Sequence, residues 1–135
     1  MKPTLVDTDV LSELLKGRNP IVERQALDYS RLVGPLTFSA VTRFEIMRGL
    51  KLQQATAQLN KFFGFCTHSV VLPVDEAVFD RASDLWVTAR SQGLPHGDAD
   101  LLIAATALRH GLLLATGNHA HFSWIAGLSL VDWRR

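Results

Sequence analysis

Four acidic residues of this chain stand beside short apolar segments. Asp7 follows the first apolar segment, Glu45 lies in an apolar stretch after the second, and Asp98 and Asp100 open a third, strongly apolar one. Carboxylates that are brought together repel one another unless a cation lies between them. Mg²⁺ is the natural choice because it prefers oxygen ligands. The pattern therefore points to a metal-dependent enzyme acting on phosphates, provided that the fold gathers these side chains.

The elements that would position these acids alternate between strands and helices. Short apolar runs predict strands at 4–6, 36–39, 69–72, 112–115 and 128–131. Apolar residues at helical spacing predict helices at 9–15, 20–32, 41–52, 54–65, 75–91 and 98–109. This alternation predicts an α/β fold, with a five-stranded, mostly parallel sheet flanked by helices on both faces. A length of 135 residues fits one domain, covering 1–135.

Ligands of open parallel sheets bind at the carboxyl ends of the strands. Asp7 and the segment Thr116–Asn118 each follow a predicted strand, so both belong to that edge. Each acid also has a purely structural explanation, since Asp7 and Asp98 suit helix caps and Asp100 suits a first helical turn. Asn118 could ligate a metal through its side-chain oxygen or serve only as a turn residue.

Glu45 is harder to explain by structure alone. It lies between Phe44 and Ile46 in the predicted helix 41–52. A carboxylate near a buried helix face is costly unless it is paired or bound to a metal. We therefore expect Glu45 to be functional.

Composition limits the function classes. The formal charge is +1, so a polyanion would have to bind a local patch, with Lys16, Arg18, Arg43 and Arg48 as candidates. The single cysteine fits a reducing cytoplasm, and neither a signal peptide nor an apolar run of about 18 residues is present. His119 and His121 lack partners at zinc-ligand spacing.

The chain resembles the PIN-domain ribonucleases, most closely their VapC-type toxin branch. The similarity is collinear over the whole chain and is carried by the segments 5–9, 39–49, 100–108, 114–122 and 127–133. The resemblance implies a PIN-like nuclease domain that cleaves RNA through metal-activated water, leaving a 3′-hydroxyl and a 5′-phosphate. The cofactor would be Mg²⁺, with Mn²⁺ as the alternative.

The resemblance also assigns roles to single residues. Asp7, Glu45 and Asp100 would be the catalytic, metal-binding acids. Auxiliary residues would be Asp98, Asn118, Thr8 and Thr116, of which the two threonines orient carboxylates. Asn118 stands where the family often has Asp, which removes a charge from any second metal site.

The implied partners are an RNA substrate, an antitoxin protein that covers the site, and a second copy of the chain in a homodimer. The first two helices and the segment 54–65, with Phe62, Phe63 and Phe65, would offer the antitoxin a groove or else form ordinary core.

Two alternatives remain at the level of sequence. Asp7 and Asp9 form an Asp-x-Asp pair after the first strand, which resembles haloacid-dehalogenase-type phosphatases. The second alternative is a PIN-like module that binds metal or RNA without cutting it, and Asn118 is the feature that favours it.

Overall fold

Five short strands form one parallel sheet at the centre of the molecule. The computed structural model describes residues 1–135. The strands are β1 (Thr4–Val6), β2 (Thr37–Ser39), β3 (Val70–Leu72), β4 (Leu113–Ala115) and β5 (Leu130–Val131). The helices are α1 (Thr8–Lys16), α2 (Pro20–Leu32), α3 (Ala40–Leu52), α4 (Thr56–Thr67), α5 (Glu76–Gln92), α6 (Asp98–His110) and α7 (His119–Phe122).

The strand order is β3-β2-β1-β4-β5, with β1 in the middle. Leu5 of β1 is in register with Thr37 of β2 on one side and with Leu114 of β4 on the other. The chain winds from β1 outward to β3, then returns to β4 across the other face. The crevice of such a sheet lies where the winding reverses, here between the carboxyl ends of β1 and β4.

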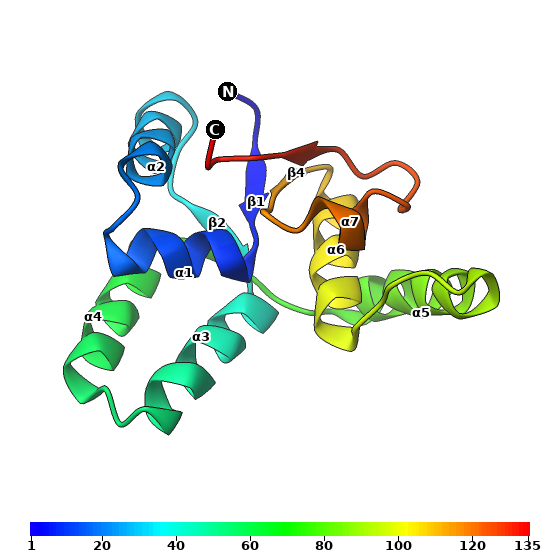
Figure 1. Ribbon diagram of the computed structural model, residues 1–135, viewed down its shortest axis with the longest axis horizontal. Helices are drawn as coiled ribbons and strands as arrows, with labels where there is room; N and C mark the ends of the chain where they lie inside the picture. Colours follow the sequence, from blue (N-terminus) through cyan, green and yellow to red (C-terminus); the bar gives the residue numbers. More distant parts are fainter.

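The core is divided into two halves by the sheet. Figure 1 shows α1 to α4 together on one side and α5 to α7 on the other. Successive strand residues point to opposite faces, so Leu5 and Leu114 pack under α5, α6 and α7, while Val6 and Ala115 pack under α1 to α4. The predicted α/β fold with helices on both faces is confirmed.

Side chains placed by the sequence begin several helices. At these helix starts, backbone N–H groups donate hydrogen bonds to the side chains of Asp7, Asn19, Ser39 and Asp75. Gly17 ends α1 in the left-handed conformation, with φ 64°. Because β1 and β2 run straight into capped helices, α1 and α3 both start at the edge where the predicted site lies.

Apart from shifts of one or two residues at other ends, the structure differs from the sequence expectation at four places. Helix α4 begins at Thr56 rather than at 54, and β5 has only two residues. Gly97 rather than Asp98 is the cap of α6, so Asp98 is its first helical residue. The one-turn helix α7 was not expected, because four residues are too few to show a helical period.

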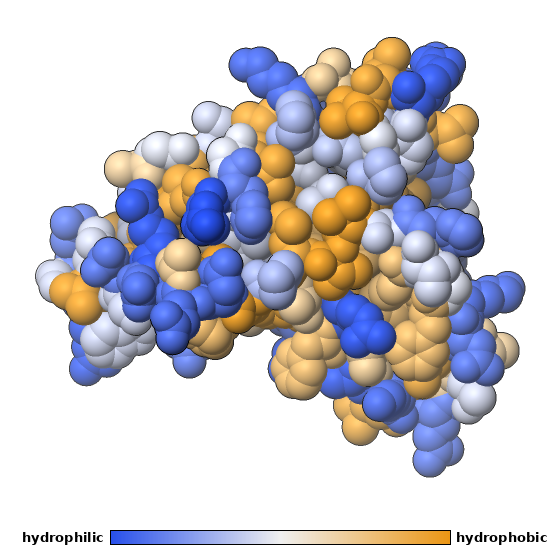
Figure 2. Space-filling model, turned by 180° about the vertical axis from the view of Figure 1, so that it is seen from behind, coloured by the Kyte–Doolittle hydropathy of each residue, from blue (hydrophilic) through white to orange (hydrophobic).

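The surface carries several large apolar side chains. Phe44 is 57% exposed, so α3 is less buried around Glu45 than its sequence suggests, whereas Phe62 is core at 2% exposure. Figure 2 shows, on the side opposite to Figure 1, hydrophobic residues gathered near the middle with hydrophilic residues around them. No helix combines the length and apolar character that crossing a membrane requires.

Candidate active site

Asp7 lies at the junction of β1 and α1 and is only 5% exposed. Its Oδ2 accepts a hydrogen bond of 2.7 Å from Thr116 Oγ1, and its Oδ1 accepts one of 2.7 Å from the backbone N–H of Thr8. Its own backbone N–H donates to Ala115 O at 2.9 Å. The carboxylate is therefore fixed between β1 and β4, inside the predicted crevice.

The environment of Asp7 disfavours its negative charge. Burial is the largest cause that raises its pKa, and the charges of Asp9 and Asp100 raise it further, to about 7. The hydrogen bonds from Thr116 and Thr8 act in the opposite direction. These two acids belong to other elements, Asp9 to α1 and Asp100 to α6.

Glu45 faces the same crevice from α3. Thr8 Oγ1 donates to Glu45 Oε1 at 2.7 Å and lies 2.9 Å from Thr42 Oγ1. Arg48, one turn further along α3, places its Nη2 3.5 Å from Glu45 Oε2. Thr8 therefore links the acid of α3 to the start of α1, next to Asp7.

The third group of acids comes from the first turn of α6. Asp100 Oδ2 lies 3.2 Å from His121 Nδ1 in α7. Asp98 stands half a turn earlier and lines an apolar hollow together with residues of α5, including Trp86. Asp100 thus contacts α7 through His121, whereas Asp98 lies on the side of α5.

The loop after β4 is held against α1. Asp9 Oδ2 accepts from the backbone N–H of Gly117 at 3.0 Å, and the N–H of Asn118 donates to Thr116 Oγ1 at 3.0 Å. The exposed side chain of Asn118 makes no hydrogen bond within the protein. Its amide is free on the same edge as Asp7.

The acids do not form a finished metal cage. No three histidine, cysteine or carboxylate side chains stand close enough to hold an ion as they are arranged. The donor set nevertheless fits a hard cation, since it offers carboxylate oxygens of which one is buried beside two like charges. Neither Asp7, Asp9 nor Asp100 forms an ion pair with a lysine or arginine.

Comparison with known proteins matches this arrangement to one family. A family model described as PIN domain matches residues 4–128. Ribonuclease VapC10 of Mycobacterium tuberculosis is 36% identical over 118 residues, which covers 87% of this chain and 84% of that protein. The chain belongs to the VapC branch of the PIN-domain family.

Two further relatives match over nearly their whole length. The tRNA(fMet)-specific endonuclease VapC of Shigella flexneri is 28% identical over 130 residues, covering 96% of both proteins. The solved structure of VapBC-1 from nontypeable Haemophilus influenzae has a TM-score of 0.85 and 27% identity, and covers 98% of each chain. The expected resemblance and fold are thereby confirmed.

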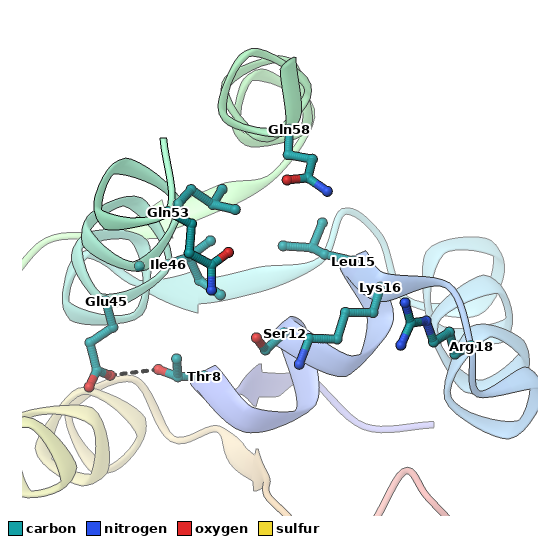
Figure 3. Close-up of a pocket in the computed structure, with 11 residues that line it drawn as sticks. Thr8, Ser12, Leu15, Lys16, Arg18, Glu45, Ile46, Gln53 and Gln58 are labelled. Atoms are coloured by element: carbon teal, nitrogen blue, oxygen red, sulfur yellow. Dashed lines mark hydrogen bonds between the residues drawn. The ribbon is translucent and has the colours of Figure 1, made fainter. Parts of the chain in front are cut away.

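The candidate RNA-binding cations of this PIN domain separate into two groups. Lys16 and Arg18 line a cavity that also contains Glu45 and Thr8 (Figure 3). Arg48 pairs with Glu45, whereas the Arg43 guanidinium lies 5.6 Å from the centre of the Phe63 ring. Arg43 is not among the residues lining that cavity.

Three polar residues of the PIN site have no role in the nuclease predicted from the sequence. Asp9 enters only as half of the Asp-x-Asp pair, His121 only as a histidine without partners at zinc-ligand spacing, and Thr42 has no assigned role. Thr42 is fully buried beside Thr8. Thr42 could have been recognised from the sequence because it lies one helical turn before Glu45. The contacts of Asp9 and His121 could not, since they depend on the loop after β4.

Proposed function

We propose that this PIN domain is a metal-dependent endoribonuclease and the toxin of a toxin–antitoxin pair. The observation that carries the proposal is Asp7, a buried carboxylate between the carboxyl ends of β1 and β4 whose pKa is raised by burial and by two neighbouring acids. Such a group stabilises the fold poorly but suits the binding of a divalent ion. The membership of the chain in the VapC branch supports ribonuclease chemistry.

The proposed metal ligands are Asp7, Glu45 and Asp100, with Asp98 and Asn118 as auxiliary groups. Because the three acids are not preassembled, their side chains must rotate when an ion binds. The ion would be Mg²⁺ or Mn²⁺. It would neutralise the scissile phosphate and lower the pKa of the attacking water.

The protein's own contribution is orientation. Thr116 holds Asp7 and Thr8 holds Glu45, each through a hydrogen bond of 2.7 Å. The His121 ring, with Nδ1 3.2 Å from Asp100 Oδ2, is placed to orient that carboxylate. Hydrolysis by water in such a site needs no side-chain nucleophile, and we expect a 3′-hydroxyl and a 5′-phosphate as products.

The proposed substrate is RNA. Local positive charge would attract it, because the net charge of the whole protein is only +1. Lys16 and Arg18 border the acidic crevice and form no ion pair, so both are free to contact phosphates. Arg48 can add a contact if an ion displaces it from Glu45. We omit Arg43 from the RNA contacts because its guanidinium lies against Phe63.

The proposed partners are an antitoxin and a second copy of the chain, and the proposed location is the cytoplasm. The groove considered for the antitoxin cannot include Phe62, which is buried, while Phe63 remains half-exposed. A dimer would cover the apolar side chains that α3 and α5 expose, among them Phe44, Phe79 and Trp86.

The decisive experiment is cleavage of a defined RNA by the purified protein with Mg²⁺ and with excess EDTA. Wild type should cut only with the metal, and Asp7→Asn and Asp100→Asn should each lose at least about 100-fold in rate while keeping the native circular dichroism spectrum. Asp84→Asn, an exposed acid of α5, is the matched control and should cut normally. Undiminished cutting in EDTA would refute the metal mechanism. RNA binding without any cutting would identify a non-catalytic module.

A further inference from the structure

A cavity of about 370 Å³ lies between α1, α3 and the start of α4. Thr8 and Glu45 stand at one end of it, and Lys16 and Arg18 stand at the other (Figure 3). Its volume lies in the range of small-ligand sites, which run from about 300 to about 1,000 Å³. The cavity therefore opens directly beside Glu45, one of the three acids that we assign to phosphodiester cleavage.

Five of the seven polar side chains lining this cavity have no partner within the protein, whereas Thr8 and Glu45 bond to each other. The five make neither a side-chain hydrogen bond nor an ion pair, and they are Ser12, Lys16, Arg18, Gln53 and Gln58. The nearby polar groups Glu13 and Asn19, in contrast, bond to each other at 2.8 Å. The lining thus offers a hydroxyl, two amides and two cations to a ligand.

Only three of the eleven lining residues are hydrophobic, namely Leu15, Ile46 and Leu50. Figure 3 shows the Gln53 and Lys16 side chains directed into the space between α1 and α3. Ser12, Lys16 and Arg18 also line a second hollow that includes Asp9. An extended ligand such as an RNA strand can therefore run from Glu45 past Lys16 and Arg18 and contact polar side chains throughout.

We propose that this cavity binds one nucleotide of the RNA strand next to the scissile phosphate and reads its base. Lys16 and Arg18 would bind the flanking phosphate, and the amides of Gln53 and Gln58 would bond to the base edge, since an amide offers both donors and an acceptor. The inference rests on the proposed ribonuclease function. A protein segment is the less favoured occupant because so little of the lining is apolar.

Gly49 provides a way to block the cavity without unfolding the protein. It lines the cavity within α3, and a Cβ added there would meet no atom within 4 Å. Gly49→Leu should fill the space while removing a helix-weakening glycine. Gly64→Leu is the matched control, since Gly64 lies within α4, outside the lining, and also has open space at its Cβ.

The test measures binding in EDTA, where no cleavage occurs. The probes are the four nucleoside 5′-monophosphates, ribose 5-phosphate and inorganic phosphate, followed by backbone amide shifts in NMR. We expect at least one nucleotide to bind about tenfold more tightly than ribose 5-phosphate, with shifts centred on Ser12, Gly49 and Gln53. Gly49→Leu should abolish these shifts and Gly64→Leu should preserve them.

Two further substitutions separate the two parts of the proposal. Gln53→Ala should reduce the differences among the four nucleotides, whereas Lys16→Gln should weaken all four alike. Equal binding of nucleotides and ribose 5-phosphate, or unchanged binding in Gly49→Leu, would overturn the proposal. So would binding of a hexaglutamate peptide in the absence of nucleotide binding, because it would assign the cavity to a protein segment.

The ribonuclease assignment is judged separately by RNA cleavage with Mg²⁺. If nucleotides bind as described but no RNA is cut, the nucleotide cavity stands and the ribonuclease function fails. If RNA is cut but none of the nucleotides binds, the ribonuclease function stands and the cavity proposal fails. If both hold, Gln53→Ala should reduce the base preference at one position beside the cut.

Discussion

The ionised form of Asp7, which the proposed function needs for metal binding, is the form that destabilises the fold. Burial and the neighbouring acids raise its pKa from 3.8 to about 7, so the folded protein binds this proton more tightly than the unfolded chain does. The resulting stability is complete below the unfolded pKa and is lost as the pH rises through about 7. At alkaline pH the ionised carboxylate therefore destabilises the metal-free fold.

Replacing Asp7 with asparagine should stabilise the metal-free protein at alkaline pH. In EDTA at a pH of about 8, Asp7→Asn should unfold about 5 °C above wild type, and this difference should vanish near a pH of about 4. Thermal unfolding followed by circular dichroism measures it. Added Mg²⁺ should raise the midpoint of wild type more than that of the variant. Equal midpoints in EDTA at all pH values would contradict this account.

Thr116 should affect activity mainly through Asp7, since it is fully buried and donates to Asp7 Oδ2, whereas its other bond only accepts the Asn118 N–H. Thr116→Val keeps the shape and removes the donor, so the rate of RNA cleavage should fall by about 10- to 100-fold. The lost hydrogen bond normally lowers the pKa of Asp7. The pH profile of kcat/KM should therefore move to higher pH, and Thr116→Ser should restore it. An unshifted profile would assign Thr116 a packing role only.

At the scale of elements, hydrogen bonds from two other segments hold the loop between β4 and α7. Asp9 accepts from the Gly117 N–H, and Arg134 Nη2 donates to Gly117 O at 3.0 Å. Arg134 is itself anchored by Asp132, whose pKa is lowered mainly by a hydrogen bond from the Arg134 N–H. The segment after β5 thereby supports the loop that carries Thr116 and Asn118.

A double-mutant cycle tests the contact between Gly117 and Arg134. A Cβ on Gly117 would overlap the Arg134 guanidinium, which can swing away because it is the end of a flexible side chain. Gly117→Ala should cost up to about 1 kcal/mol of unfolding free energy in urea. In the Arg134→Ala background the same change should cost less, with a coupling of about 0.5 kcal/mol. Strict additivity would show that the two residues do not interact.

Elements with a strong local signal were predicted from the sequence, and those set by tertiary contacts were not. The helix predicted at 20–32 has the same bounds in the structure, because the capping residue Asn19 and Pro20 begin it locally. The pairing of Asp9 with Gly117 joins residues 108 positions apart, so no local pattern announces it. Likewise, the sequence indicated that Glu45 needs a partner but could not identify Thr8.

At the scale of the whole molecule, the acids come from both halves of the divided core. Asp7 caps α1 and Glu45 lies in α3, whereas Asp100 belongs to α6 on the opposite side of the sheet. The site depends on the correct docking of the two layers on β1 and β4. Small rearrangements between layers should therefore affect metal binding before they affect either core.

The proposed dimer should depend on the apolar face of α5. Phe79 is 53% exposed and lines two hollows that reach α3 and α6. Phe79→Glu should weaken self-association by at least about tenfold in sedimentation equilibrium. Leu27→Glu on α2 is the control, since Leu27 is 73% exposed on another surface. A wild type that stays monomeric, or a stronger effect of the control, would reject this face.

The central position of β1 has a consequence during synthesis. Its neighbour β4 is formed by residues 113–115, so the strand made first waits for a partner that leaves the ribosome almost last. Until then Thr116 cannot reach Asp7, and the acids of α6 have no completed sheet to dock on. An unfinished polypeptide therefore lacks the complete site, and under the proposed function we expect it to leave the RNA of its own ribosome intact.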